Sequence, residues 1–131
     1  MKILLIDDSY EFTEPVKELI EREGHTVDVI TNSDEAFQKL GQVHQYDILL
    51  LDLMFIVGEK FTLGAYPEVG VLFYKQIRKG NLKLPIIIIS ALSKNNFQSY
   101  FEGDKNLFYI NKPLSSNMEE LKNCINTIEK K

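Results

Sequence analysis

The sequence has a single cysteine, Cys124, no tryptophan, and only seven glycines and four prolines among its 131 residues. One cysteine excludes an internal disulfide and makes a thiolate metal cluster implausible. With so few glycines and prolines and 44% hydrophobic residues, the chain can build a core, which argues against disorder. Basic residues are also outnumbered, 15 against 19 acidic ones, so no direct nucleic-acid binding is expected.

Long apolar runs are absent as well. No run approaches the ~20 residues that a membrane-spanning helix needs. Only four apolar residues separate Lys2 from Asp7, which is too few for the apolar part of a signal peptide. The length fits one domain. We therefore expect a single domain over residues 1–131 that is cytoplasmic, lies in a reducing compartment and does not bind membranes.

The sequence does contain five short apolar runs, at residues 3–6, 26–30, 48–51, 86–89 and 107–110. Three of them, including the four isoleucines of 86–89, have no polar residue in alternation. This pattern is typical of strands in a parallel sheet that helices cover on both faces.

Helical patterns fill the intervals between these runs. The first ends at Gly24, and either Ser9 or Thr13 could cap its start. Three further helices are expected over about 33–41, 70–80 and 93–101, and Ser33 is the expected cap of the first of these. The last helix begins at 115 or 116, and Cys124 lies beside its apolar stripe. Strands that alternate with helices predict an α/β fold of three layers with right-handed crossovers.

Polar residues follow the expected strands. Asp7 and Asp8 come after the first strand, Asp52 after the third, Ser90 after the fourth, and Lys112 soon after the fifth. Ligands of open parallel sheets bind at the carboxyl ends of the strands. Carboxylates gathered there would repel one another, and Mg²⁺, which takes one or two carboxylates, would relieve the repulsion. Taken singly, each residue could instead be a cap, a turn or an exposed loop residue; together they form a phosphoryl-transfer set.

These residues stand in the motifs "ILLIDDS", "DILLLDLM", "GVLFYKQIRK", "LPIIIISA" and "FYINKPL". With these motifs in this order, the whole chain resembles the receiver domain of two-component response regulators. The resemblance implies a three-layer αβα sandwich around a five-stranded parallel sheet, with the flavodoxin-like strand order 2-1-3-4-5 and five helices.

The resemblance also implies the roles of the acidic residues. Asp52 would be the aspartate that accepts a phosphoryl group from a sensor histidine kinase or a phosphotransfer protein. Asp8 would bind Mg²⁺, or another divalent cation, directly, and Asp7 through water. Met54 would complete the metal site with its main-chain carbonyl.

Four further residues correspond to the family's catalytic and switching positions. Ser90 would hydrogen-bond the phosphoryl oxygen, Lys112 would pair with its charge, and Pro113 would follow as a structural residue. A phosphoryl group adds about −1.5 to −2 charges, so it should attract Ser90 and leave space that the Tyr109 ring can fill. In the alternative, Tyr109 is a static, half-buried ring.

The switch would change the surface of the 93–101 helix, the 107–110 strand and the last helix. That surface would control a downstream protein or a fused output domain, and it could support a homodimer. The aromatic residues Phe97, Tyr100 and Phe101 could face such a partner or belong to the core. The chain itself would be no metabolic enzyme, because it would catalyse only its own phosphorylation and dephosphorylation. It is either a stand-alone receiver or a fragment of a larger regulator.

The sequence departs from the family pattern after Asp52. Ile56 stands where receivers usually have proline, and an irregular stretch over 53–69 is much longer than the ~2–6 residues usual for such a loop. This insertion is either a tolerated surface loop or a flap that screens Asp52 or forms a partner-specific surface. Met54 and Leu92 occupy positions that influence attacking water in the family, and both are apolar, which predicts a long-lived aspartyl phosphate.

Three other functions compete with this interpretation. A degenerate receiver would act as an interaction module without phosphorylation. A small phosphatase with an aspartate nucleophile would need a second aspartate at position 54, which is methionine here. A flavin-binding flavodoxin-like protein would need a Ser/Thr/Gly-rich phosphate loop after the first strand, where this chain has carboxylates.

Overall fold

The computed structural model of the protein describes residues 1–7, 10–53, 66–80, 83–90, 99, 101–111 and 118–130. In this part of the chain, five strands form one sheet in the order β2-β1-β3-β4-β5, and all neighbouring strands are parallel. The strands are β1 (Lys2–Ile6), β2 (Thr26–Ile30), β3 (Ile48–Asp52), β4 (Ile86–Ser90) and β5 (Leu107–Asn111). The predicted fold class and strand order are confirmed.

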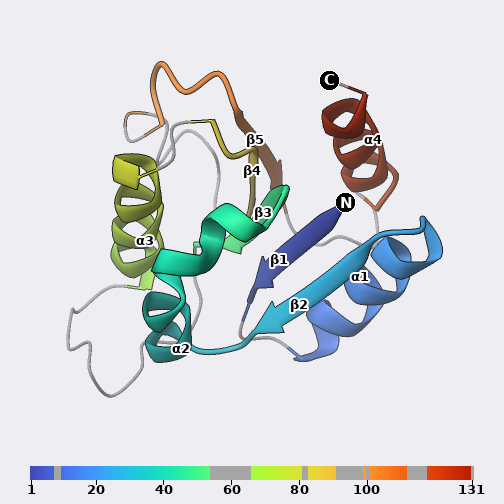
Figure 1. The fold of residues 1–131 in the computed structure, drawn as a ribbon, viewed down its shortest axis with the longest axis horizontal. Coiled ribbons are helices and arrows are strands. Elements are labelled where there is room, and N and C mark those ends of the chain that lie inside the picture. The colour runs from blue at the N-terminus through green and yellow to red at the C-terminus, as the bar shows by residue number, and fades with distance from the viewer. Residues whose placement is uncertain are drawn as a thin grey trace.

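Helices cover both faces of the sheet (Figure 1). On one face lie α1 (Tyr10–Arg22) and α4 (Met118–Glu129); on the other lie α2 (Ser33–Gln38), the 3-10 helix η1 (Leu40–Gln45) and α3 (Tyr66–Gly80). The predicted helix over 93–101 falls almost wholly outside the described residues. Within the described ranges, no helix combines the length and the apolar character needed to cross a bilayer.

The core consists of two clusters, one on each face of the sheet. In β3, Ile48 and Leu50 belong to the cluster that α1 and α4 cover, whereas Leu49 and Leu51 belong to the cluster under α2, η1 and α3. Successive side chains of a strand point to opposite faces, so a strand covered on both sides must be apolar throughout. Every residue of β3 and β4 is buried, which explains their unbroken apolar sequences.

Two helix starts differ from the predictions. Asn32, not Ser33, caps α2: its side-chain oxygen accepts a hydrogen bond from the Glu35 amide at 2.8 Å. The predicted helix over 33–41 also ends earlier as an α-helix, at Gln38, and continues as η1. In α1, Thr13 lies inside the helix, so the alternative that it caps the start is wrong. Ser9 lies outside the described residues.

Helix α3 begins at Tyr66, four residues before the predicted start at Gly70. The last four residues of the stretch predicted to be irregular, 53–69, are therefore helical. Pro67 falls in the first turn, where the missing N–H of proline costs no helical hydrogen bond. The sequence pattern places the start at Gly70, whereas Gly70 is the fifth residue of the helix.

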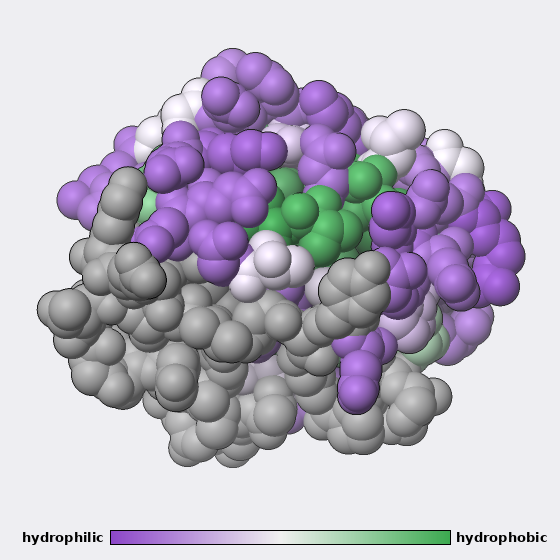
Figure 2. Space-filling view, turned by 90° about the horizontal axis from the view of Figure 1, so that it is seen from below, coloured by the Kyte–Doolittle hydropathy of each residue, from purple (hydrophilic) through white to green (hydrophobic). Residues whose placement is uncertain are grey.

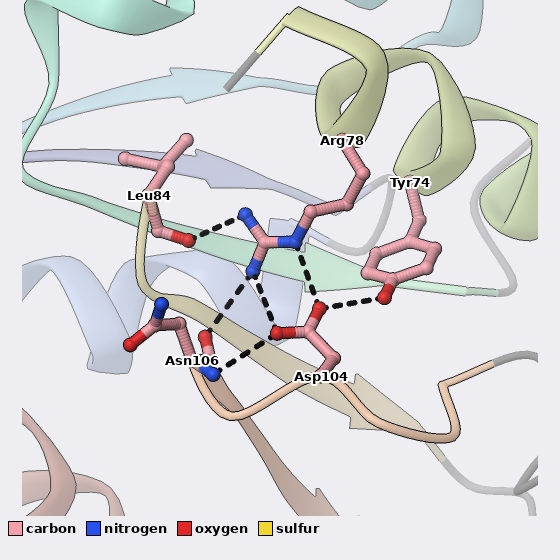
Figure 3. Close-up of polar contacts among 5 residues, drawn as sticks. All are labelled: Tyr74, Arg78, Leu84, Asp104 and Asn106. Carbon is pink, nitrogen blue, oxygen red and sulfur yellow. Dashed lines mark hydrogen bonds and ion pairs between the residues drawn. The ribbon is translucent and has the colours of Figure 1, made fainter. Parts of the chain in front are cut away.

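An ionic cluster joins α3 to the segment before β5, at the end of the sheet where β4 and β5 begin (Figure 3). Arg78 Nε donates to Asp104 Oδ2 at 2.8 Å, and the Tyr74 hydroxyl donates to the same oxygen at 2.6 Å. The guanidinium also donates to the main-chain carbonyls of Leu84 and Asn106, at 2.7 and 3.3 Å. The Arg78 and Asp104 side chains are only 11% and 9% exposed, so this contact is largely protected from solvent.

Candidate functional site at the carboxyl end of the sheet

Three of the predicted site residues lie at the carboxyl ends of the three central strands. Asp7 directly follows β1, Asp52 is the last residue of β3, and Ser90 is the last residue of β4. Their exposed fractions are 0%, 3% and 0%. Burying a carboxylate is costly unless charge or hydrogen bonds compensate it, so two buried carboxylates at one edge are unusual for a purely structural role.

The strand register brings these residues to the same level of the sheet. Ile6 pairs with Leu51, so the next residues along the two strands, Asp7 and Asp52, lie side by side. Asp52 pairs with Ile89, and Ser90 follows one residue later. Because neighbouring strands are about 4.8 Å apart, the three residues lie together at one end of three adjacent strands.

Tyr109 in β5 extends this group. Burial raises the pKa of Tyr109 above its usual value; a side-chain hydrogen bond with Ser90 lowers it, and the negative charge of Asp52 raises it. The net direction is upward, so the Tyr109 hydroxyl keeps its proton at neutral pH. The phenol thus interacts with both Ser90 and Asp52, and its half-buried ring packs against the cluster on the α3 face.

The remaining predicted site residues, Asp8, Met54, Lys112 and Pro113, lie outside the described residues, as do Ile56, Leu92, Phe97 and Tyr100. Among the described residues, no group of three His, Cys, Asp or Glu side chains could hold a metal ion. Asp7 and Asp52 nevertheless fit the donor set of Mg²⁺, which binds one or two carboxylates and retains several waters.

The face of the molecule toward which β1 and β2 point is shown in Figure 2. Among the coloured residues, a small hydrophobic area lies in the centre and hydrophilic residues surround it. Asp7 and Asp52 each follow a buried apolar residue of their strand and are themselves buried, where water screens charge poorly.

The structure decides one alternative that the sequence left open. Phe101 belongs to the core, with 5% of its surface exposed. Its ring packs edge-on against Tyr74, with centroids 4.9 Å apart, and lies 6.3 Å from the Tyr109 ring. Sequence reasoning missed the importance of Gly70, whose close contact with the residue after Asp52 is described below. The sequence signal was the position of Gly70 as the first residue of the motif "GVLFYKQIRK".

Comparison with known proteins shows the family to which the chain is similar. The family model of the response regulator receiver domain matches residues 3–126. The chain is 34% identical over 96 residues to the transcriptional regulatory protein CrdR of Helicobacter pylori, covering 72% of this chain and 39% of that protein. It is 35% identical over 91 residues to a CpxR homolog of Haemophilus influenzae, covering 69% and 34%. The chain thus spans well under half the length of these curated relatives.

Solved structures show the same fold. The receiver domain of the Francisella response regulator 1452 has a TM-score of 0.73 and 27% identity, over 98% of this chain and 96% of that one. The Thermotoga maritima response regulator TrrA, in complex with Mg²⁺ and BeF, has a TM-score of 0.74 and 25% identity, over 97% of both chains. The chain belongs to the response regulator receiver domain family. It is therefore a receiver domain of two-component signalling.

Proposed function

We propose that Asp52 is the phospho-acceptor of this receiver domain and that its phosphorylation, with Mg²⁺ bound, changes the surface around β5. The observation that carries the proposal is the position of buried Asp7, Asp52 and Ser90 at the ends of adjacent strands, with Tyr109 interacting with the last two. A surface turn or a helix cap would not need two buried carboxylates beside a buried hydroxyl.

In the proposed reaction, an Asp52 carboxylate oxygen attacks the phosphorus of a phosphohistidine on a kinase or phosphotransfer protein. The phosphorus–nitrogen bond breaks, its electron pair remains on the imidazole nitrogen, and an acyl phosphate forms on Asp52. A divalent cation held by Asp7, Asp8, Asp52 and the Met54 carbonyl would offset the negative charge of carboxylates and phosphoryl oxygens. Lys112 would add an ammonium charge to the same oxygens.

The switch follows from a competition for Ser90. Its hydroxyl now hydrogen-bonds Tyr109, but the phosphoryl oxygens on Asp52 are charged and therefore stronger acceptors. Once Ser90 turns to them, Tyr109 loses a partner and can change its packing against Phe101. The altered surface around β5 would then control a downstream protein, a second copy of the chain or a fused output domain. We place this switch in the cytoplasm, and this domain would make no direct contact with nucleic acid.

The test is phosphorylation of the purified chain by acetyl phosphate, followed by intact mass. We expect a gain of one phosphoryl group in the presence of Mg²⁺ and none when EDTA removes the metal, because the buried carboxylates would then repel the phosphoryl donor. If no mass gain occurs under either condition, the alternative of a degenerate receiver that acts only as an interaction module is correct.

The lifetime of the product gives a separate prediction. Because Met54 and Leu92 cannot orient attacking water by hydrogen bonds, the aspartyl phosphate should decay slowly after removal of acetyl phosphate. Met54→Asn, which introduces a hydrogen-bonding side chain, should shorten the lifetime. Mass spectra of wild type and variant taken over time would show this, and rapid spontaneous loss from the wild type would contradict it.

A further inference from the structure

Gly70 lies where helix α3 meets the residue that follows Asp52. A Cβ atom at Gly70 would stand 2.5 Å from the Leu53 carbonyl oxygen, 2.6 Å from Leu53 Cα and 2.9 Å from the Leu53 carbonyl carbon. Non-bonded carbon atoms prefer separations of about 3.5–4.0 Å. All three atoms belong to the main chain, so no change of rotamer could relieve the overlap, and the backbone itself would have to move.

Both partners of this contact are held by the rest of the fold. Helix α3 packs on the sheet through buried Val71, Phe73 and Ile77, and Arg78 anchors its far end to Asp104. Leu53 is fully buried and directly follows β3, which is paired with β1 and β4. A side chain at position 70 would therefore strain the short segment that includes Leu53 and the neighbouring Asp52.

Glycine at this position is unfavourable for the helix itself. Gly70 is the fifth residue of α3, and glycine inside a helix is less favourable than alanine because it loses more backbone entropy on folding. Gly80, the last residue of the same helix, has no atom within 4 Å of the position that a Cβ would take. Of these two glycines of α3, only Gly70 lies so close to the main chain of Leu53 that a Cβ atom would overlap it.

We infer that Gly70 is a positioning residue for phosphoryl transfer, because the lack of a side chain lets the α3 backbone hold Leu53, and with it the Asp52 carboxylate, in the reactive position. This inference rests on the proposed phosphorylation of Asp52. It assigns no chemical step to Gly70. The residue acts only through the main chain next to the acceptor.

The experiment compares Gly70→Ala with Gly80→Ala at saturating acetyl phosphate and Mg²⁺. Gly70→Ala should lower the phosphorylation rate about 10- to 100-fold, since a displacement near 1 Å can cost ~10²-fold in rate. Gly80→Ala should leave the rate unchanged. Ile77→Val loosens the same helix without adding an atom near Leu53, and it should also leave the rate unchanged while lowering thermal stability.

Each result decides the inference. A wild-type rate in Gly70→Ala would overturn it, and so would an equal loss in Ile77→Val, because the effect would then be one of stability. If the wild type itself is not phosphorylated, the proposed function fails, and that outcome is distinct from a failure at Gly70 alone.

A measurement on the wild type covers the case in which Gly70→Ala does not fold. With isotope-labelled glycine, Mg²⁺ and beryllofluoride as a phosphoryl mimic, the Gly70 amide resonance should shift when bound fluoride is seen in the fluorine spectrum. The resonances of Gly24 and Gly80, far from the carboxyl end of the sheet, should stay in place. An unmoved Gly70 resonance with beryllofluoride bound would overturn the inference.

Discussion

Asp52→Asn is expected to abolish phosphorylation by acetyl phosphate and Mg²⁺. The substitution keeps the size and shape of the side chain but removes the carboxylate that attacks phosphorus, and an amide is a poor nucleophile. Because Asp52 is 3% exposed beside Asp7, losing its charge also relieves repulsion at this edge, so the variant should remain folded. Intact mass after incubation should show no phosphoryl adduct.

Asp47→Asn is the matched control for this experiment. Asp47 precedes the same strand at its other end, where its exposed carboxylate accepts a hydrogen bond from the Lys2 amide at 2.8 Å. An asparagine there can accept the same bond, so the chain loses one negative charge and little else. The control should be phosphorylated like the wild type. An adduct on Asp52→Asn would place the acceptor elsewhere and remove the central assignment.

Asp104→Asn is expected to lower the free energy of unfolding by about 3 kcal/mol, because the Arg78 guanidinium would remain largely buried without its counter-charge. The NH₂ group of the asparagine would also replace one of the two oxygens that accept hydrogen bonds from Arg78 and Tyr74, and a donor would then face a donor. Urea unfolding at neutral pH, followed by circular dichroism, measures the loss. Glu102→Gln, an exposed neighbour in the same segment, should change the free energy by no more than about 0.5 kcal/mol.

The contribution of Asp104 to the free energy of unfolding should decrease as the pH falls. Burial alone would raise the pKa of Asp104, but hydrogen bonds from Arg78, Tyr74 and the Asn106 amide lower it below its usual value. A carboxyl whose pKa is lower in the folded state contributes stability above its unfolded pKa, near 3.9, and loses it as the pH falls through the folded value. The difference between wild type and Asp104→Asn should therefore be constant from about pH 5 to 8 and shrink below about pH 4.

The same cluster gives a way to separate stability from signalling. It lies where β4 and β5 begin, whereas Asp52 and Ser90 lie where β3 and β4 end. Under conditions in which it is folded, Asp104→Asn should still be phosphorylated at Asp52. A large loss of phosphorylation in folded Asp104→Asn would mean that the two ends of the sheet are coupled, contrary to this expectation.

The sequence by itself was enough to predict the fold class and the positions of the strands. Four consecutive isoleucines in 86–89 are stable only where both faces of a strand are buried, and the polar residues after such runs must lie at the sheet edge. Asp7, Asp52 and Ser90 could be singled out for this reason, because parallel strands place their carboxyl ends together in any fold of this class.

Only the tertiary structure decided details that depend on contacts between distant segments. Asn32 and Ser33 are both good caps, and which of them caps α2 depends on where the chain leaves β2. The Arg78–Asp104 pair joins residues 26 positions apart, and Phe101 is in the core because α3 and β5 bring Tyr74 and Tyr109 to it. The contact of Gly70 with Leu53 cannot be predicted from the motif that contains Gly70. Local preferences and periodicity act over a few residues, whereas a close approach of two backbones exists only once the helix has packed against the sheet.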